Sequence, residues 1–248
     1  MNPRLFLFIS MSLISILPLT NFLKSDLSKS SNIKDAIKTL YSLDLIEGRL
    51  NKILYSTGIS IKPNDVIIGH EKWLFLGDRH SEIISKYRKG SEQEKEISEK
   101  IINTQKAWNK YFSNKGVNDF KIIVGPNKST IYSEKLPEWA KSKGKSISNN
   151  LYKSNLYVNV INELIEAKSF ANTYDRTDTH WNSFGASVAF RKLINSINHG
   201  EDFIYPSSDF GEIVQIRNLK GGDLTKFLKA QKYISDSVTK TKINHLNN

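Results

Sequence analysis

The chain has 248 residues, of which 39% are hydrophobic and 25% charged, so its composition is that of a globular protein and excludes an intrinsically disordered one. This length accommodates one sizeable domain plus an appendage. The 36 basic and 25 acidic residues give a formal net charge of +11, which favours an anionic partner such as an acidic polysaccharide or lipid headgroups. Nucleic acid is not expected as a partner, because the lysines are spread along the chain without a basic arm or a recognisable motif.

Residues 1–23 contain the one strongly apolar run of the sequence, RLFLFISMSLISILPL, with Arg4 at its start and Lys24 beyond its end. Such a run is typical of a secretion signal or a signal-anchor. No Ala-x-Ala-like cleavage site follows, which favours an uncleaved anchor. A cleaved signal peptide stays open, because the run is slightly short for a membrane span. Either interpretation places the rest of the chain outside the cytoplasm, and the lack of cysteine agrees with an oxidising compartment.

Residues 24–60 are interpreted as a helical stalk between the membrane and the domain. Apolar residues recur near helical spacing from residue 31 to residue 55, with charged residues between them. We expect Thr57 and Gly58 to end this helix. A helix that grips a membrane partner is the alternative. The apolar positions are Ile33, Ile37, Leu40, Leu43, Leu50 and Leu54.

Two short apolar runs, residues 65–69 and 73–77, predict a β-hairpin with a turn at residues 70–72. Trp73 at the start of the second strand has two interpretations. Its indole face could stack on a sugar ring, but a place in the core is favoured.

A helix followed by a buried strand predicts an α/β unit with a parallel sheet. Ser91 and Glu94 form a capping box before the helical run SEQEKEISEKIINTQKAWNKYF, which Gly116 ends, and residues 120–124 read as the strand. Because functional loops follow the carboxyl ends of such strands, Lys128 and Tyr132 are candidates for the rim of a substrate-binding site. A surface lysine and a half-buried tyrosine are the alternatives.

Residues 142–150 read as an exposed loop and residues 151–167 as a further helix. The run YDRTDTHWNSFGASVA at 174–189 then places Asp178 two residues before His180. An aspartate can accept the Nδ1 proton of a nearby histidine and leave Nε2 to take a proton from a nucleophile. A helix that begins near residues 182–183 would direct N–H groups toward developing negative charge.

Two other interpretations of the Asp-x-His pair are a structural turn and metal ligation. Zinc needs three or four ligands, the other histidines have no ligand spacing, and cysteine is absent, so no metal site is expected. The remaining histidines are His70, His80, His199 and His245. Beyond the pair, His199-Gly200 is expected to end the helix, and residues 205–218 alternate as strands do. Asp223 is a possible helix cap, and Ser237 precedes a polar tail.

Four segments resemble, in order, the alginate O-acetyltransferase family of AlgJ/AlgX-type proteins, which carry an SGNH-hydrolase-like domain. They are GHEKWLFLGD at 69–78, IIVGPNKSTIYSEKLPEW at 122–139, YDRTDTHWNSFGA at 174–186 and GGDLTKFL at 221–228. The resemblance implies an α/β fold, with an SGNH-hydrolase-like parallel sheet flanked by helices, over residues 61–248.

The same resemblance implies O-acetylation of a cell-surface or secreted polysaccharide, without a cofactor. His180 would be the general base and Asp178 its orienter, with Arg176 and Trp181 shaping the acceptor site. Acetyl would come from a membrane-bound O-acyltransferase partner. The protein would lie in the periplasm, anchored to the inner membrane, or be released there if the signal is cleaved.

One departure from the family pattern concerns the nucleophile. The family uses a serine in a Gly-Asp-Ser context, placed after the Gly-Asp-Leu segment, and this sequence contains no Gly-Asp-Ser. Ser237 lies too close to GGDL for that role. We therefore expect either a domain that is incomplete at its C-terminus, or a non-catalytic relative that binds polysaccharide or supports an acetylation complex. A secreted hydrolase that removes acetyl groups would use the same residues.

Overall fold

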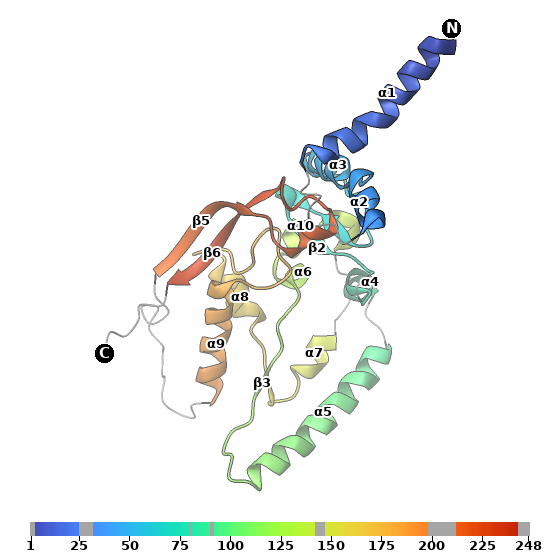
Figure 1. The fold of residues 1–248 in the computed structure, drawn as a ribbon. Helices are drawn as coiled ribbons and strands as arrows, with labels where there is room; N and C mark the ends of the chain where they lie inside the picture. The colour runs from blue at the N-terminus through green and yellow to red at the C-terminus, as the bar shows by residue number, and fades with distance from the viewer. Residues whose placement is uncertain are drawn as a thin grey trace. The chain divides into compact units, whose positions relative to one another are not determined.

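The computed structural model describes residues 3–24, 32–79, 81–89, 92–141, 147–197 and 212–242 (Figure 1). The chain divides into two compact units, Met1–Leu50 and Asn51–Asn248, which we call unit 1 and unit 2. Each is described by itself.

Unit 1 consists of helices. Helix α1 (Pro3–Phe22) is the described helix that is long and apolar enough to cross a membrane, and only 6% of its most apolar window is buried. The side-chain amide of Asn21, at its end, donates to the carbonyl oxygens of Leu40 at 2.7 Å and Ser42 at 2.8 Å. These bonds connect α1 to the segment that follows helix α2 (Ile33–Leu40).

The single amphipathic helix predicted for residues 31–55 is in fact two helices, α2 and α3 (Asp44–Thr57). The break occurs because the hydroxyl of Ser42 accepts the backbone N–H of Asp44 at 3.2 Å, as a capping side chain does, and starts a new helix. Gly58 follows α3 with φ +83°, which confirms the predicted end.

The predicted β-hairpin is confirmed. Strands β1 (Val66–Ile68) and β2 (Leu74–Leu76) pair antiparallel, with Ile67 opposite Phe75, and the short 3₁₀ turn His70–Lys72 joins them. The hairpin also makes a main-chain hydrogen bond to another segment, because the N–H of Leu74 donates to the carbonyl oxygen of Arg176 at 3.0 Å. The hairpin thereby supports a distant segment of the sequence.

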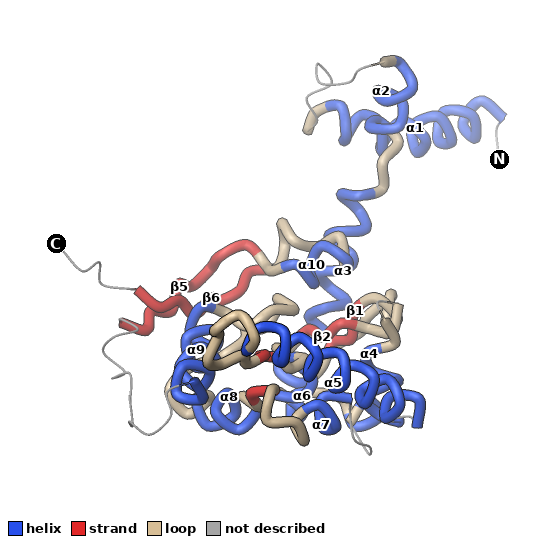
Figure 2. The backbone as a smooth tube through the Cα atoms, turned by 90° about the horizontal axis from the view of Figure 1, so that it is seen from below, coloured by secondary structure: helices blue, strands red, loops and turns tan. Residues whose placement is uncertain are grey.

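The parallel sheet is small. Among the described residues, one pair of strands runs parallel, β3 (Ile122–Ile123) beside β4 (Tyr157–Val158). Strands β5 (Glu212–Lys220) and β6 (Ser235–Lys242) form an antiparallel hairpin. The fold is therefore mixed α/β and mostly helical, and Figure 2 shows the long β5–β6 hairpin at the edge of a largely helical unit 2.

Two segments differ from the prediction. Residues 151–167 are not one helix, because α7 (Ile147–Leu151) ends where the prediction began and β4 intervenes before α8 (Ile161–Ala167). The predicted polar tail around Ser237 is strand β6, whose sequence SDSVTKTK carries β-branched residues that suit a strand. Both outcomes depend on pairing with another strand, β3 for β4 and β5 for β6.

Helices pack against several of these strands. Helix α5 (Glu92–Ser113) matches its prediction, with Gly116 beyond its end at φ +84°, whereas its predicted cap, Ser91, lies outside the described residues. Helix α9 (Ser183–Ile197) also begins where predicted, and it packs against α8 and β6 (Figure 1). Its predicted end at residues 199–200 lies outside the described residues, as do residues 142–146 of the predicted loop. The shorter helices of unit 2 are α4 (Ile83–Lys89), α6 (Lys128–Ile131) and α10 (Asp223–Phe227).

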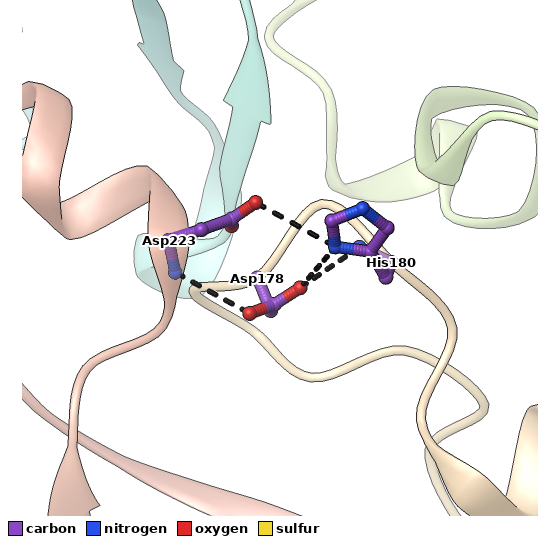
Figure 3. Close-up of side chains that lie close together, drawn as sticks. All are labelled: Asp178, His180 and Asp223. Atoms are coloured by element: carbon purple, nitrogen blue, oxygen red, sulfur yellow. Dashed lines mark hydrogen bonds and ion pairs between the residues drawn. The ribbon is translucent and has the colours of Figure 1, made fainter.

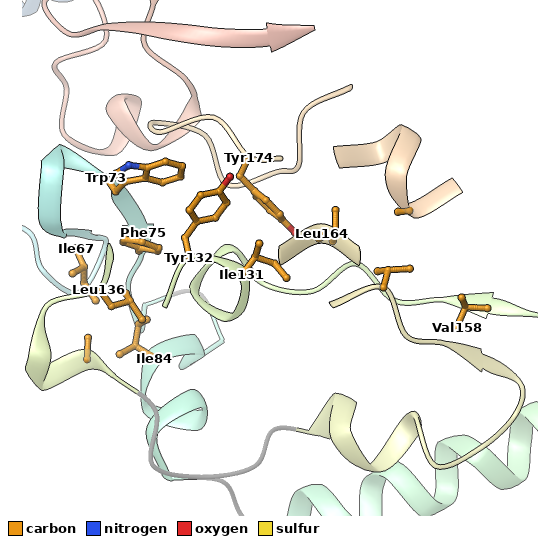
Figure 4. Packing of buried hydrophobic residues seen from close by; sticks show 13 residues of the cluster. Ile67, Trp73, Phe75, Ile84, Ile131, Tyr132, Leu136, Val158, Leu164 and Tyr174 are labelled. Atoms are coloured by element: carbon orange, nitrogen blue, oxygen red, sulfur yellow. The ribbon is translucent and has the colours of Figure 1, made fainter. Parts of the chain in front are cut away.

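The main core of unit 2 lies beside the β1–β2 hairpin (Figure 4). Trp73 stacks on Tyr132 with ring centroids 4.1 Å apart, and Tyr174 meets Tyr132 edge-on at 6.1 Å. Trp73 is 5% exposed, so of its two interpretations the place in the core is correct. Aliphatic side chains complete this core, among them Ile67, Ile84, Ile131, Leu136, Val158 and Leu164.

Candidate active site

The candidate active site is built on the turn at residues 175–180. Its two ends are brought together because Tyr174 and Trp181 form an isolated antiparallel bridge. Helix α9 follows at once, and the side-chain oxygen of Asn182 accepts the N–H of Gly185 at 3.0 Å. Capping by asparagine explains why the helix starts here, and it also occupies a helix N–H that could otherwise bind an anion.

The imidazole of His180 is held on one side. Its Nδ1 lies 3.0 Å from Oδ1 of Asp178, and its backbone N–H donates to the same oxygen at 2.9 Å (Figure 3). The side chain is 78% exposed, and Nε2 has no hydrogen-bond partner in the part of the chain that the structure describes. A carboxylate at Nδ1 favours the tautomer that carries its proton there, so Nε2 is available to accept a proton.

A second carboxylate, that of Asp223, reaches the same ring from the start of α10. Its Oδ2 lies 3.6 Å from Nδ1 of His180 (Figure 3). Thr179 bridges the two, because its N–H donates to Oδ1 of Asp223 at 2.8 Å and its hydroxyl contacts both Oδ2 of Asp223 and, at 3.1 Å, Nδ1 of His180. Sequence reasoning treated Asp223 only as a helix cap, whereas the residue at the cap position is Gly222.

The carboxyl of Asp178 is favoured in its ionised form. Burial raises its pKa, but hydrogen bonds from the backbone and ring of His180 and from the backbone N–H of Asp223 outweigh burial, so the pKa lies below its ordinary value. The Asp223 N–H donates to Oδ2 of Asp178 at 3.3 Å. A carboxylate that stays charged at neutral pH can stabilise the imidazolium that forms when Nε2 takes a proton.

The segment GGDL forms the support beneath the turn. The N–H of Gly222 donates to the hydroxyl of Thr177 at 2.8 Å, and the N–H of Leu224 donates to the Thr177 carbonyl oxygen at 3.2 Å. A Cβ at Gly222 would lie 2.9 Å from Oδ2 of Asp178, so only glycine fits this close approach. These contacts hold residues 221–224 against the turn at residues 175–180, although Gly222 and Thr177 lie 45 positions apart in the sequence.

Strand β6 supports the turn from another direction through Asp236. Its Oδ2 accepts both the N–H and the hydroxyl of Thr177, at 2.8 and 2.6 Å. Its Oδ1 lies 3.4 Å from Nε of Arg176, whose Nη2 donates to the carbonyl oxygen of Ser235 at 3.0 Å. The guanidinium of Arg176, predicted to face an acceptor, is therefore engaged with β6, although a third of the side chain remains exposed.

Trp181 is half-buried at the edge of the site and packs toward the loop after β3. A Cβ at Gly125 would lie 3.5 Å from its indole ring. The loop after β3 therefore lies against Trp181 at Gly125, and the indole is only partly covered.

Lys128 and Tyr132 are not at a rim. Tyr132 is 2% exposed, and its hydroxyl accepts the N–H of Thr173 at 2.9 Å, so it belongs to the core and cannot contact a substrate in this arrangement. Lys128 is 5% exposed and lies beneath the turn. Neither side chain points to solvent, because both satisfy main-chain groups inside unit 2. Sequence reasoning missed this, since a lysine is rarely buried.

The three ring-side groups could in principle hold a cation. One ligand atom from each of Asp178, His180 and Asp223 lies within 4.8 Å of the others. The sequence offered only two of these three, because nothing local connects Asp223 to the Asp-x-His pair. The same atoms already serve hydrogen bonds: both oxygens of Asp223 accept from Thr179, and Oδ1 of Asp178 accepts from His180. This favours acid/base chemistry, and we assign no metal.

His180 lies on open surface and does not line the cavity of about 470 Å³ that α8, α9 and β5 form. Phe170, Phe184 and Arg191 are among the residues that line this cavity. A ring on open surface is accessible to a group carried by a large molecule, such as a polymer, as well as to a small one.

Comparison with known proteins identifies one family. The family model described as the SGNH hydrolase-like domain of the acetyltransferase AlgX matches residues 66–245. Two solved chains match. One is the O-acetyltransferase domain of Pseudomonas putida AlgJ, at 18% identity and a TM-score of 0.47, over 73% of this chain and 66% of that one. No curated protein sequence matches. The chain thus spans slightly less than two thirds of the solved relative.

Proposed function

The chain belongs to the SGNH hydrolase-like acetyltransferase family of AlgX and AlgJ, and we propose that it takes part in the O-acetylation of a cell-surface or secreted polysaccharide. One observation carries the proposal: an exposed imidazole, His180, is held at Nδ1 by the Asp178 carboxylate and presents Nε2 to solvent. The net charge of +11 would draw an acidic polysaccharide toward such a site.

In the proposed reaction, Nε2 of His180 removes the proton of an attacking hydroxyl as its oxygen bonds to the acetyl carbonyl carbon. Asp178 stabilises the imidazolium that results. When the tetrahedral intermediate collapses, the bond to the donor's oxygen breaks, and the imidazolium returns the proton to that leaving oxygen. By resemblance to the family, a serine takes the acetyl group first and a sugar hydroxyl then takes it from the serine by the same steps.

The serine is not assigned to a residue of this chain. No Gly-Asp-Ser occurs in the sequence, and no serine hydroxyl contacts the His180 ring within the described ranges. Ser237 is exposed on β6 next to Asp236, whose side chain is directed to Thr177. Adjacent residues of a strand point to opposite faces, which directs Ser237 away. This observation favours a second candidate, a non-catalytic component that binds the polysaccharide or supports the acetylation complex.

The proposed setting is the periplasm. We infer that residues 1–23 anchor the chain in the inner membrane or act as its secretion signal, because α1 is apolar and carries no acidic residue. Residues 24–60 would act as a stalk and residues 61–248 as the SGNH hydrolase-like domain. The acetyl donor would be a membrane-bound O-acyltransferase, and Arg176 and Trp181 would contact the acceptor sugar.

The test uses the full chain, a chromogenic acetyl ester as donor and an acidic oligosaccharide as acceptor. Mass spectrometry of the oligosaccharide detects transfer, release of free acetate detects hydrolysis, and calorimetry measures glycan affinity. We expect acetylated oligosaccharide with the wild type and none with His180→Ala, while His70→Ala, which removes another exposed histidine, retains transfer. Free acetate alone would identify a hydrolase. Glycan affinity that survives His180→Ala, without turnover by the wild type, would identify the binding component.

A further inference from the structure

A buried lysine lies directly beneath the catalytic turn. Lys128 opens helix α6, immediately after the Gly-Pro loop that follows β3, and only 5% of it is exposed. Its ammonium lies 4.9 Å from the ring centre of Trp73 and 5.6 Å from that of Phe75. Aromatic faces attract a cation when water is excluded. These rings hold the side chain in place but do not satisfy its N–H groups.

Three main-chain carbonyls satisfy those groups. Nζ of Lys128 donates to the carbonyl oxygens of Asp175 at 2.7 Å, Arg176 at 2.8 Å and Asp178 at 2.9 Å. An ammonium has three N–H donors, and the turn supplies three acceptors. All three belong to the turn that presents His180, so one cation fixes the backbone on both sides of Thr177.

The surrounding charges support the protonated form in this position. Burial lowers the pKa of Lys128 to about 7, and the aspartates nearby oppose this lowering. A buried charged group without partners is very costly, whereas one whose hydrogen bonds are all made can specify a single local geometry. The opposing aspartates are Asp236, Asp178, Asp223 and Asp175.

We propose that Lys128 is a positioning residue, whose ammonium holds the carbonyls of the 175–178 turn so that Asp178 faces Nδ1 of His180. The proposal rests on the proposed function for its effect on rate, but the geometry it describes can be measured without turnover. The Arg176 carbonyl shows how the turn is fixed, because it accepts from Lys128 and also from the N–H of Leu74 in β2. Lys128 therefore acts through the backbone and needs no contact with substrate.

The first experiment compares Lys128→Met with Lys168→Met in the full chain. Methionine keeps an unbranched apolar stem and removes every donor. Lys168 is a matched control, because its ammonium also donates to a main-chain carbonyl, that of Ile131 at 2.8 Å, and lies 4.6 Å from the ring centre of Tyr132, but it does not contact the turn. Circular dichroism checks folding, nitrogen NMR of the His180 ring reports its tautomer, and the oligosaccharide assay reports transfer.

We expect Lys128→Met to mix the tautomers of His180 and to slow transfer by roughly tenfold to a hundredfold, because a small misplacement of a catalytic group is enough for such a loss. Lys168→Met should change neither. A folded Lys128→Met protein with the wild-type tautomer would overturn the proposal. If the wild type itself transfers no acetyl, the proposed function fails while the tautomer comparison still decides the positioning role.

Two further measurements do not depend on the folding of the methionine variant. In the wild type, Lys128 should be the slowest to react with limiting acetic anhydride among the lysines whose ammonium makes a hydrogen bond or an ion pair. Reaction as fast as that of Lys168 would overturn the proposal. Since the chain has no cysteine, Lys128→Cys can be alkylated uniquely, in denaturant, with 2-bromoethylamine and refolded. The restored ammonium should recover the His180 tautomer, which alkylation with a neutral group of equal size should not.

Discussion

Replacing Asp178 by asparagine removes one charge at the centre of the site and changes little in volume. The carboxylate accepts three hydrogen bonds, from the N–H and Nδ1 of His180 at 2.9 and 3.0 Å and from the N–H of Asp223 at 3.3 Å. An asparagine has one acceptor oxygen, so its NH₂ group must face an N–H on one side or the other. We expect Asp178→Asn to lower the free energy of unfolding by about 1.5–3 kcal/mol, the usual contribution of a hydrogen bond to a charged group.

Its effect on acetyl transfer should be much larger than its effect on stability. Without the carboxylate, Nδ1 loses the group that fixes its proton and the imidazolium loses its counter-charge, so we expect a loss of roughly 10²–10⁴-fold. Because the folded pKa of Asp178 is lowered, its stabilisation is present above the unfolded pKa of about 3.9 and disappears as the pH falls through the folded pKa. The stability difference between wild type and variant should therefore shrink in acid.

Asp78→Asn is the matched control for this variant. Asp78 also has a lowered pKa, in spite of burial, because its carboxylate accepts the N–H and the hydroxyl of Ser85 at 2.8 and 2.7 Å. The assay measures urea unfolding between pH 3 and pH 7 together with transfer to the oligosaccharide. Asp78→Asn should lose stability with the same pH dependence and retain transfer. Transfer by Asp178→Asn within about threefold of the wild type would refute the orienting role.

Three further variants probe the surroundings of the site. Gly222→Ala should lower the free energy of unfolding by about 1–3 kcal/mol and slow transfer, because the added Cβ would meet the Thr177 carbonyl oxygen at 2.8 Å. Thermal unfolding measures the loss of stability, and a variant as stable as the wild type would contradict the prediction. Asp175→Asn should change the free energy of unfolding at pH 7 in the opposite direction to Asp178→Asn. Burial raises the Asp175 pKa, so the stability it contributes below its unfolded pKa is lost as the pH rises, and the amide variant should be at least as stable as wild type at pH 7 in urea. Leu164→Ala, in the fully buried core, should cost about 2–5 kcal/mol in the same titration, and a cost below 1 kcal/mol would contradict its packing.

Local patterns predicted the elements whose causes are local. The β1–β2 hairpin, helix α5 and the start of α9 are encoded in apolar spacing and in capping residues such as Asn182. Strand β4 was missed inside a predicted helix, because Tyr157 and Val158 obtain their strand geometry by pairing with residues 122–123. Strand β6 was missed for the same reason, since it obtains its strand geometry by pairing with β5, and residues 221–234, which include α10, separate the two strands.

The site was predicted in part. The Asp178–His180 contact follows from their spacing, because a turn can return the imidazole to a carboxylate two residues earlier. Asp223 was missed as a partner of the ring, because its approach depends on the docking of α10 beneath the turn. Lys128 was predicted near the site but on its surface, and its burial depends on carbonyl acceptors that exist only once the turn has formed.

The most direct measurement is the protonation pattern of the His180 ring in the folded wild-type protein, read from its nitrogen chemical shifts at a pH where the ring is neutral. The geometry around Asp178 predicts a proton on Nδ1 and a free lone pair on Nε2. A proton on Nε2, or a pattern that Asp178→Asn leaves unchanged, would contradict the assignment of His180 as the general base.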